Sequence, residues 1–240
     1  MGEQFDPTQT SGEIAGATAR LLDTARTMSD DDVLGPSLLP GWSRGHVLTH
    51  LARNADGLRN LLLGAMEGVE RKAYPGGPES RAADIEAGSS RPVEEHVADI
   101  EAASAGFAET VAAMTPSAWE FVLAWGSAGQ KRPAREVLDA RLREVAIHHV
   151  DLDFGYTAAN WAPAFALLIL RSALPAFEAR GLVPCTLRPT DVEATVLASG
   201  GSDVEVSGPA HALATWLLGR DSGADLKVSG GSLPTPPEWK

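Results

Sequence analysis

The segment RLREVAIHHVD, from Arg141 to Asp151, decides the fold, because it carries a polar stripe along the edge of an apolar helical face. Arg141, Glu144, His148 and Asp151 follow a 3-4-3 spacing and therefore share one face of a helix. The adjacent face is apolar and consists of Leu138, Leu142, Val145 and Leu152. A polar stripe that borders an apolar seam faces the interior or the rim of a helical bundle.

Glu144 and His148 lie one turn apart, and their side chains lean in the same direction, so together they can bind one metal ion. The same spacing also fits a solvated glutamate beside a hydrogen-bonded boundary histidine, because such pairs are common on helices. The pattern has no diagnostic spacing of the His-Glu-x-x-His kind. The residues alone leave both interpretations open.

A second pair of histidines lies on an earlier predicted helix. His46 and His50 are one turn apart beside the seam residues Val47 and Leu51, and Gly57 leaves room on the same flank two turns later. Either histidine has the spacing of a third metal ligand.

Apolar residues at helical spacing predict the helices of an N-terminal bundle and of the segment that follows it. They cover 9–29, 43–66, 92–114, 133–153 and 163–180. A loop rich in Pro and Gly is predicted over 74–90.

After Gly181 the pattern changes to short β-branched runs. The predicted order is three strands, a helix and a strand, at 186–188, 192–197, 204–206, 209–218 and 226–228. The predicted fold class is therefore α+β, with an up-and-down helical bundle over residues 1–160 and a helix plus a small α/β domain over 161–240.

Composition excludes several classes of function. Thirty-two acids against 20 bases give a formal charge of −12, which disfavours nucleic acid and anionic membranes as partners. The longest apolar run, 165–170, is too short to span a bilayer. No secretory signal is visible, and a single cysteine fits a reducing compartment, so we expect a cytoplasmic protein.

Motifs for a protein-borne nucleophile or a nucleotide cofactor are missing from the sequence. We find no Gly-x-Ser-x-Gly elbow, phosphate loop or dinucleotide fingerprint. Cys185 lies in a turn-and-strand context without a histidine nearby in sequence, which is typical of a packing thiol. An enzyme built on this chain would obtain its reactive group from a metal or an external cofactor.

Four segments carry a family resemblance. The segment PGWSRGHVLTHLARNAD, residues 40–56, resembles the N-terminal signature of the mycothiol-dependent maleylpyruvate isomerases, which belong to the wider DinB-like metalloprotein group. The segment 143–152 resembles the second signature of that family. Residues 81–88 and 208–220 resemble its loop segment and its C-terminal unit, so the resemblance spans nearly the whole chain.

The resemblance implies a DinB-like bundle that binds one divalent metal, zinc, through His50, Glu144 and His148. The usual ligand set of the group has three histidines, so Glu144 is a variation on it, and His46 competes with His50 by spacing. Three protein ligands leave one coordination position open, as in catalytic zinc sites.

The implied reaction is the mycothiol-dependent isomerisation of maleylpyruvate to fumarylpyruvate in gentisate breakdown. A zinc-held thiolate would add to the double bond, and rotation followed by elimination would give the trans isomer. Arg220, and after it Arg81, are the expected catalytic clamps for the carboxylates of the substrate. Arg53 and Asp151 are expected to bind the cofactor.

Two other functions fit the same residues: a mycothiol S-transferase acting on electrophiles, and a non-catalytic metal-binding or ligand-binding regulator. The expected partners are a small anionic substrate and a low-molecular-weight thiol, with the chain a monomer or a weak homo-oligomer.

Overall fold

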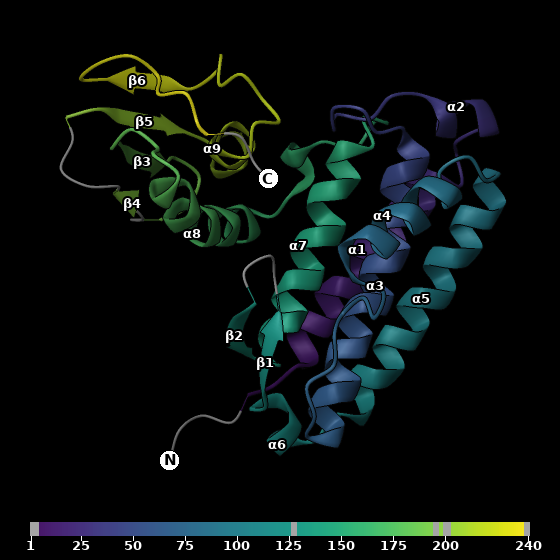
Figure 1. Ribbon diagram of the computed structural model, residues 1–240. Helices are drawn as coiled ribbons and strands as arrows, with labels where there is room; N and C mark the ends of the chain where they lie inside the picture. The colour runs from purple at the N-terminus through teal and green to yellow at the C-terminus, as the bar shows by residue number, and fades with distance from the viewer. Residues whose placement is uncertain (1–4, 126–128, 194–196, 199–202, 238–240) are drawn as a thin grey trace. The chain divides into compact units, whose positions relative to one another are not determined.

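Four long helices with continuous apolar sides form the N-terminal unit, Met1–Tyr156, of this computed structural model. These helices are α1 (Thr8–Ala25), α3 (Arg44–Glu67), α5 (Val93–Ala113) and α7 (Glu136–Asp151). They lie side by side (Figure 1), and α3 packs on both α5 and α7 while α1 covers the other sides of the same two helices. The structure describes residues 5–125, 129–193, 197–198 and 203–237.

The core of this bundle consists of large side chains from all four helices. Leu21, Leu51, Leu62, Ile100 and Leu138 are each at most 1% exposed. Burial of one such side chain stabilises a fold by about 1.5–3 kcal/mol, so the apolar seams provide the main driving force for assembly of the bundle.

The bounds predicted for the second helix agree with those of α3 because both ends of α3 carry clear capping residues. The Ser43 hydroxyl accepts a hydrogen bond from the His46 backbone N–H, and the His46 ring accepts one from the Ser43 N–H. Gly68 ends the helix in a left-handed conformation with φ of 70°. The first helix, in contrast, ends earlier than residue 29, because Ser29 caps a separate short helix, α2 (Asp30–Leu34).

The prediction of a loop over residues 74–90 was wrong, because much of this segment is the helix α4 (Gly77–Gly88). Its sequence GPESRAADIEAG contains good helix formers, but glycines at its start and end and a proline in its first turn resemble a loop. Tight packing fixes α4 against α3: a Cβ on Gly88 would lie 2.6 Å from the Thr49 methyl carbon.

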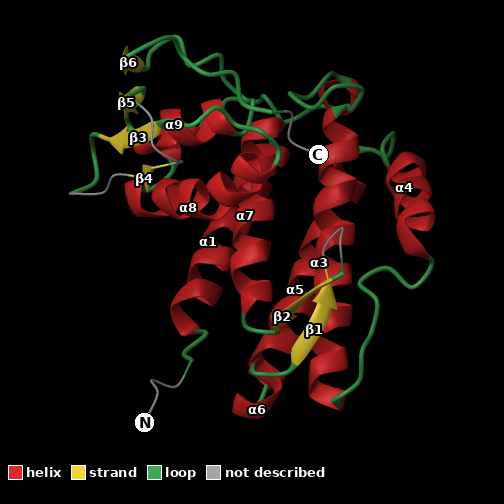
Figure 2. Cartoon of the chain, turned by 60° about the vertical axis from the view of Figure 1, so that its left-hand side comes forward, coloured by secondary structure: helices red, strands yellow, loops and turns green. Residues whose placement is uncertain are grey.

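Two further elements between α5 and α7 were also missed. The short helix α6 (Pro116–Trp119) precedes a hairpin of β1 (Val122–Trp125) and β2 (Gln130–Pro133). Figure 2 shows this hairpin in yellow beside the bundle helices. Because β2 extends to Pro133, α7 begins at Glu136, three residues later than predicted.

The C-terminal unit, Thr157–Lys240, is a mixed α/β structure. Its helical elements are η1 (Ala158–Asn160), α8 (Pro163–Ala179) and α9 (Ala210–Leu217). Its strands are β3 (Thr186–Pro189), β4 (Leu197–Ala198), β5 (Glu205–Gly208) and β6 (Lys227–Ser229). The sheet has the order β4-β3-β5-β6, with β3 and β5 parallel and the outer pairs antiparallel.

One side of this sheet is covered by α9, which contacts β3 and β5 and packs against α8. Cys185 is fully buried just before β3, as expected of a packing thiol. The strand predicted over 192–197 is not formed at 192–193, which lie in a turn, and 194–196 fall outside the described residues. The predicted α+β class, with a DinB-like bundle and a small α/β part, is confirmed. Among the described residues, every helix is too short or too polar to cross a membrane.

Candidate metal centre

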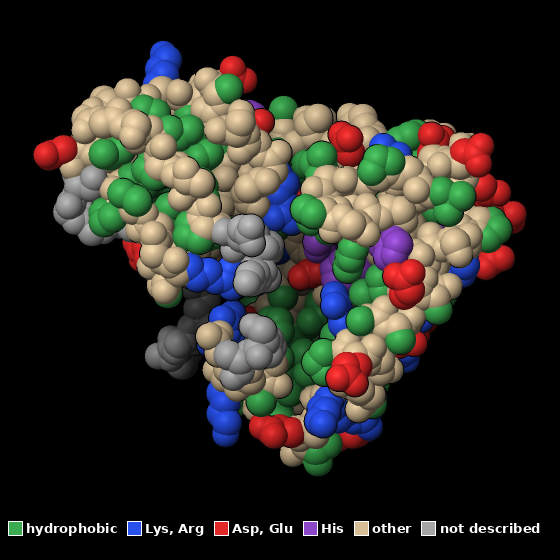
Figure 3. Space-filling model, turned by 45° about the horizontal axis from the view of Figure 1, so that its top comes forward, with side chains coloured by type: hydrophobic (Ala, Val, Ile, Leu, Met, Phe, Trp, Pro, Cys, Tyr) green, Lys and Arg blue, Asp and Glu red, His purple; other side chains and the backbone are tan. Residues whose placement is uncertain are grey.

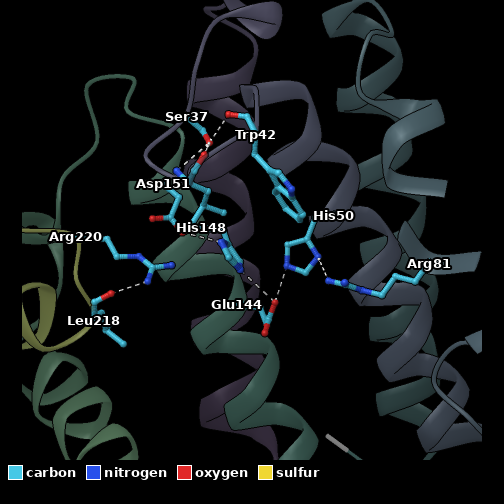
Figure 4. Close-up of polar contacts among 10 residues, drawn as sticks. Ser37, Trp42, His50, Arg81, Glu144, His148, Asp151, Leu218 and Arg220 are labelled. Carbon is cyan, nitrogen blue, oxygen red and sulfur yellow. Dashed lines mark hydrogen bonds and ion pairs between the residues drawn. The ribbon is translucent and has the colours of Figure 1, made fainter. Parts of the chain in front are cut away.

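The polar stripe of α7 meets α3 inside the N-terminal unit. His50 comes from the second turn of α3, and Glu144 and His148 come from adjacent turns of α7 (Figure 4). One ligand atom from each of the three side chains lies within 4.8 Å of the other two. The His50 Nε2 is 2.9 Å from Glu144 Oε2, and the His148 Nε2 is 3.5 Å from the same oxygen.

The donor set fits a divalent metal such as zinc. Two imidazole nitrogens and one carboxylate oxygen are a ligand combination of catalytic zinc sites that keep a further position open. The three side chains are graded in exposure: His50 is 5% exposed, His148 16% and Glu144 34%. The two histidines of the cluster are therefore largely buried, and solvent reaches the cluster from the Glu144 side. The space-filling view shows histidine side chains (purple) as a small group at the surface, beside both acidic and basic side chains (Figure 3).

A buried carboxylate orients His148. The Asp151 Oδ2 lies 2.8 Å from His148 Nδ1, and Asp151 is fully buried at the end of α7. A carboxylate behind a metal-ligating histidine fixes the ring orientation and the tautomer that presents Nε2. Asp151, which the sequence analysis assigned to cofactor binding, thus contacts a member of the cluster.

The other histidine has a different neighbour. The Arg81 Nη2 lies 2.8 Å from His50 Nδ1, and the Arg81 guanidinium also covers the Tyr74 ring at 5.3 Å. Tyr74 in turn packs on α3 where Gly57 leaves space, since a Cβ there would lie 2.9 Å from the Tyr74 ring. Sequence reasoning missed Tyr74, although the room left by Gly57 was a usable signal.

The ionisation of the cluster follows from burial and hydrogen bonds. Burial lowers the pKa of His50 to about 4, against the opposing effect of Glu144. Burial also acts on His148 and Glu144, but their hydrogen bonds outweigh it. Bonds to Asp151 and Glu144 raise the pKa of His148 to about 9, and bonds to both histidines hold the pKa of Glu144 well below its usual value. Without metal at neutral pH, the cluster holds a neutral His50, an ionised Glu144 and a protonated His148.

His46 and Arg53, which were also named from the sequence, have partners outside the cluster. His46 is turned toward Glu86, at 3.1 Å, and stacks on Trp42, so the structure groups His50 rather than His46 with the α7 pair. Arg53 forms ion pairs with Asp56 and Asp99.

Two further arginines, Arg220 and Arg141, were named from the sequence. Arg220 lies in the C-terminal unit, just after α9, and donates to the Leu218 carbonyl at 2.7 Å. Arg141 is fully buried and bonds to the Leu51 carbonyl and to Asn54, so it lies in the core of the bundle.

Comparisons with known proteins place the chain in a family. Residues 14–153 match the family described as mycothiol maleylpyruvate isomerase N-terminal domain. Two solved structures are similar over 98% of this chain and 98% of their own, at 26% sequence identity and a TM-score of 0.88. They are a mycothiol-dependent maleylpyruvate isomerase and a histidine-to-alanine mutant described under the same name. No curated protein matches the chain.

Proposed function

Since the chain belongs to the mycothiol maleylpyruvate isomerase family, we propose that it catalyses the mycothiol-dependent cis–trans isomerisation of maleylpyruvate to fumarylpyruvate at a metal centre. The observation that carries this proposal is the convergence of His50, Glu144 and His148 within 4.8 Å. A role in the breakdown of gentisate and related aromatic compounds follows from the identity of that substrate.

The three residues would bind a divalent metal, and their two nitrogen donors and one oxygen donor favour zinc. When bound, this metal supplies a site that stabilises the mycothiol sulfur as a thiolate near neutral pH. Glu144 lowers the net charge of the centre, and Asp151 holds His148 with Nε2 toward the metal position. Trp42, whose ring meets His50 edge-on at 5.7 Å, covers that ring on one side.

Binding of an anionic substrate to a chain of charge −12 requires local cations. Arg81 contacts the cluster through His50. Arg220 is assigned to a substrate carboxylate on the strength of the family resemblance, and Arg53 is a weaker candidate for mycothiol because Asp56 and Asp99 already engage it. A guanidinium binds a carboxylate through two parallel hydrogen bonds, which positions as well as attracts the substrate.

One experiment separates this function from its alternatives. Purified protein loaded with zinc is mixed with mycothiol and maleylpyruvate, and the products are followed by proton NMR. Formation of fumarylpyruvate that depends on both metal and mycothiol supports the isomerase. A parallel reaction with monobromobimane in place of maleylpyruvate tests the S-transferase. Stable metal binding without turnover in either reaction would contradict both and favour a binding protein.

A further inference from the structure

The N-terminal unit contains a second recess, away from the metal cluster. It lies between α1 and α5, has a volume of about 610 Å³ and includes none of the three cluster residues in its lining. Exposed alanines form its walls: Ala15 and Ala19 on α1, and Ala105, Ala108 and Ala112 on α5. We refer to it as the α1–α5 groove. Its volume is within the range of about 300–1,000 Å³ that is usual for small-molecule sites.

Arg141 lines the same groove although it is fully buried. Its partners are neutral: the Leu51 carbonyl at 2.8 Å, Asn54 Oδ1 at 2.9 Å and Ser104 Oγ at 3.4 Å. Among the described residues no carboxylate forms an ion pair with this guanidinium. Burial lowers the pKa of Arg141 to about 10, so the group remains a cation at neutral pH. Glu144 and Asp56 favour the charged form of Arg141 only through space, without contacting it. A buried charge that no carboxylate contacts is costly, and an anion placed directly beside it removes part of this cost.

Two hydroxyl groups on the α1 side of the groove lack hydrogen-bond partners among the described residues. The Ser11 and Thr18 hydroxyls are buried without a hydrogen-bond partner among the described residues, and both residues line the groove. Thr18 as a whole is 7% exposed. Two turns of helix separate these residues, or about 10 Å along the axis of α1.

We propose that the α1–α5 groove binds a small monocarboxylate with an apolar tail, of the size of a medium-chain fatty acid. The tail would lie between the alanine walls, and the carboxylate would take the place of the Ser104 hydroxyl beside Arg141. The Ser104 contact is at the long end of hydrogen-bond geometry and is therefore the weakest of the three that hold the guanidinium. The charge of Arg141 distinguishes this ligand from a neutral or cationic apolar molecule.

The test uses decanoate as the probe and isothermal titration calorimetry on the full-length, metal-loaded protein. We expect one saturable site, with 1-decanol and decylamine at least about tenfold weaker, because a charge-assisted hydrogen bond contributes a factor of this order. Equal affinities for the three probes, or no saturable decanoate binding, would overturn the proposal. Titration of the His50→Ala protein distinguishes the groove from the metal centre, since decanoate binding should be retained there.

Two matched pairs of variants locate the site. Ser104→Asp places a carboxylate beside Arg141 and should weaken decanoate at least about tenfold, whereas the neutral Ser104→Asn should retain affinity within about threefold. Ala108→Phe should block the groove, whereas Ala102→Phe, an exposed position of α5 outside the lining, should not. Decanoate binding that is equal within either pair would contradict the proposal. So would a wild-type dimer that Ala108→Phe converts to monomer in sedimentation equilibrium, because a second copy would then occupy the groove.

Discussion

Arg81 and His50 form a contact that constrains where the imidazole carries its proton. The Arg81 guanidinium donates to His50 Nδ1 at 2.8 Å, so this nitrogen must be the acceptor and Nε2 must carry the hydrogen. The Nε2–H then points to Glu144 Oε2 at 2.9 Å. A metal bound at Nε2 needs the opposite tautomer, with the proton on Nδ1. The Arg81 contact and a metal at His50 Nε2 therefore oppose each other.

The first prediction follows from this opposition. Arg81→Met should bind zinc about tenfold more tightly than the wild type, because it removes a charge-assisted hydrogen bond and a nearby positive charge that compete with the metal. Zinc affinity measured by competition with a chromophoric chelator checks this. Arg71→Met is the control, because this substitution removes the same charge at a residue that pairs with Glu67 and does not contact the cluster. Equal affinities in the two variants would show that Arg81 does not oppose the metal.

The second prediction concerns the ligands. His50→Ala, Glu144→Ala and His148→Ala should each retain less than about a tenth of an equivalent of zinc, since two remaining ligands make a weak site. Circular dichroism should show an intact bundle, because the apolar seams that form it are separate from these residues. His46→Ala is the control one turn away on α3. Elemental analysis that finds full zinc in His50→Ala and little in His46→Ala would reverse the choice of histidine.

The helix α3 was predictable because its apolar periodicity agrees with its cap at Ser43. The helix α7 was predictable from its periodicity alone, and without a side-chain cap its start was placed three residues too early. The closeness of Glu144 and His148 was also predictable, since it depends only on the geometry of one helix. The choice between His46 and His50 was not, because it depends on the rotation of α3 against α7, which packing sets. The contact between Arg81 and His50 could not be predicted for a related reason. The helix α4, which carries Arg81, has little amphipathic pattern and is positioned by close contacts such as that of Gly88 with Thr49.

The third prediction is a release of protons on metal binding. The pKa of His148 is raised to about 9 in the metal-free protein, so the ring is protonated at pH 7 and must lose a proton to bind the metal. Zinc affinity should therefore rise about tenfold per pH unit from pH 7 and level off near pH 9. Calorimetry in buffers of different ionisation enthalpy should count about one proton released per zinc at pH 7. An affinity that is constant between pH 7 and 9 would exclude a protonated His148.

The fourth prediction tests the carboxylate behind His148. Asp151→Asn retains the shape of the side chain but removes the charge that orients the ring, so zinc affinity at pH 9 should fall about 10–100-fold. The comparison is made at pH 9 because the variant also lowers the pKa of His148, which would offset the loss at neutral pH. Asp153→Asn is the control, because Asp153 is exposed and its φ of 49° suits asparagine. An unchanged affinity in Asp151→Asn would mean that Asp151 does not support the metal site.

The fifth prediction concerns stability in acid and depends on His96, in the first turns of α5. The ring is fully buried, neither nitrogen has a hydrogen-bond partner among the described residues, and burial lowers its pKa to about 4. The N-terminal end of a helix further disfavours a cation. Between pH 6.5 and 4, His96 is protonated in the unfolded chain but stays neutral in the folded protein. The free energy of unfolding therefore falls as the pH falls.

The loss from this ring should reach about 3 kcal/mol near pH 4 and should be absent above pH 7. His96→Leu removes the titrating ring and leaves an apolar side chain of similar size in a fully buried site. The difference in unfolding free energy between variant and wild type, from urea titrations at pH 4 to 7.5, isolates the contribution of His96 from those of the other histidines. We expect the stability of the leucine variant at pH 7.5 to be within about 1 kcal/mol of the wild type, as volume-conserving changes usually leave it. The variant should then become the more stable protein as the pH falls below 6.5. A difference that stays constant across this range would show that His96 does not resist protonation in the folded protein.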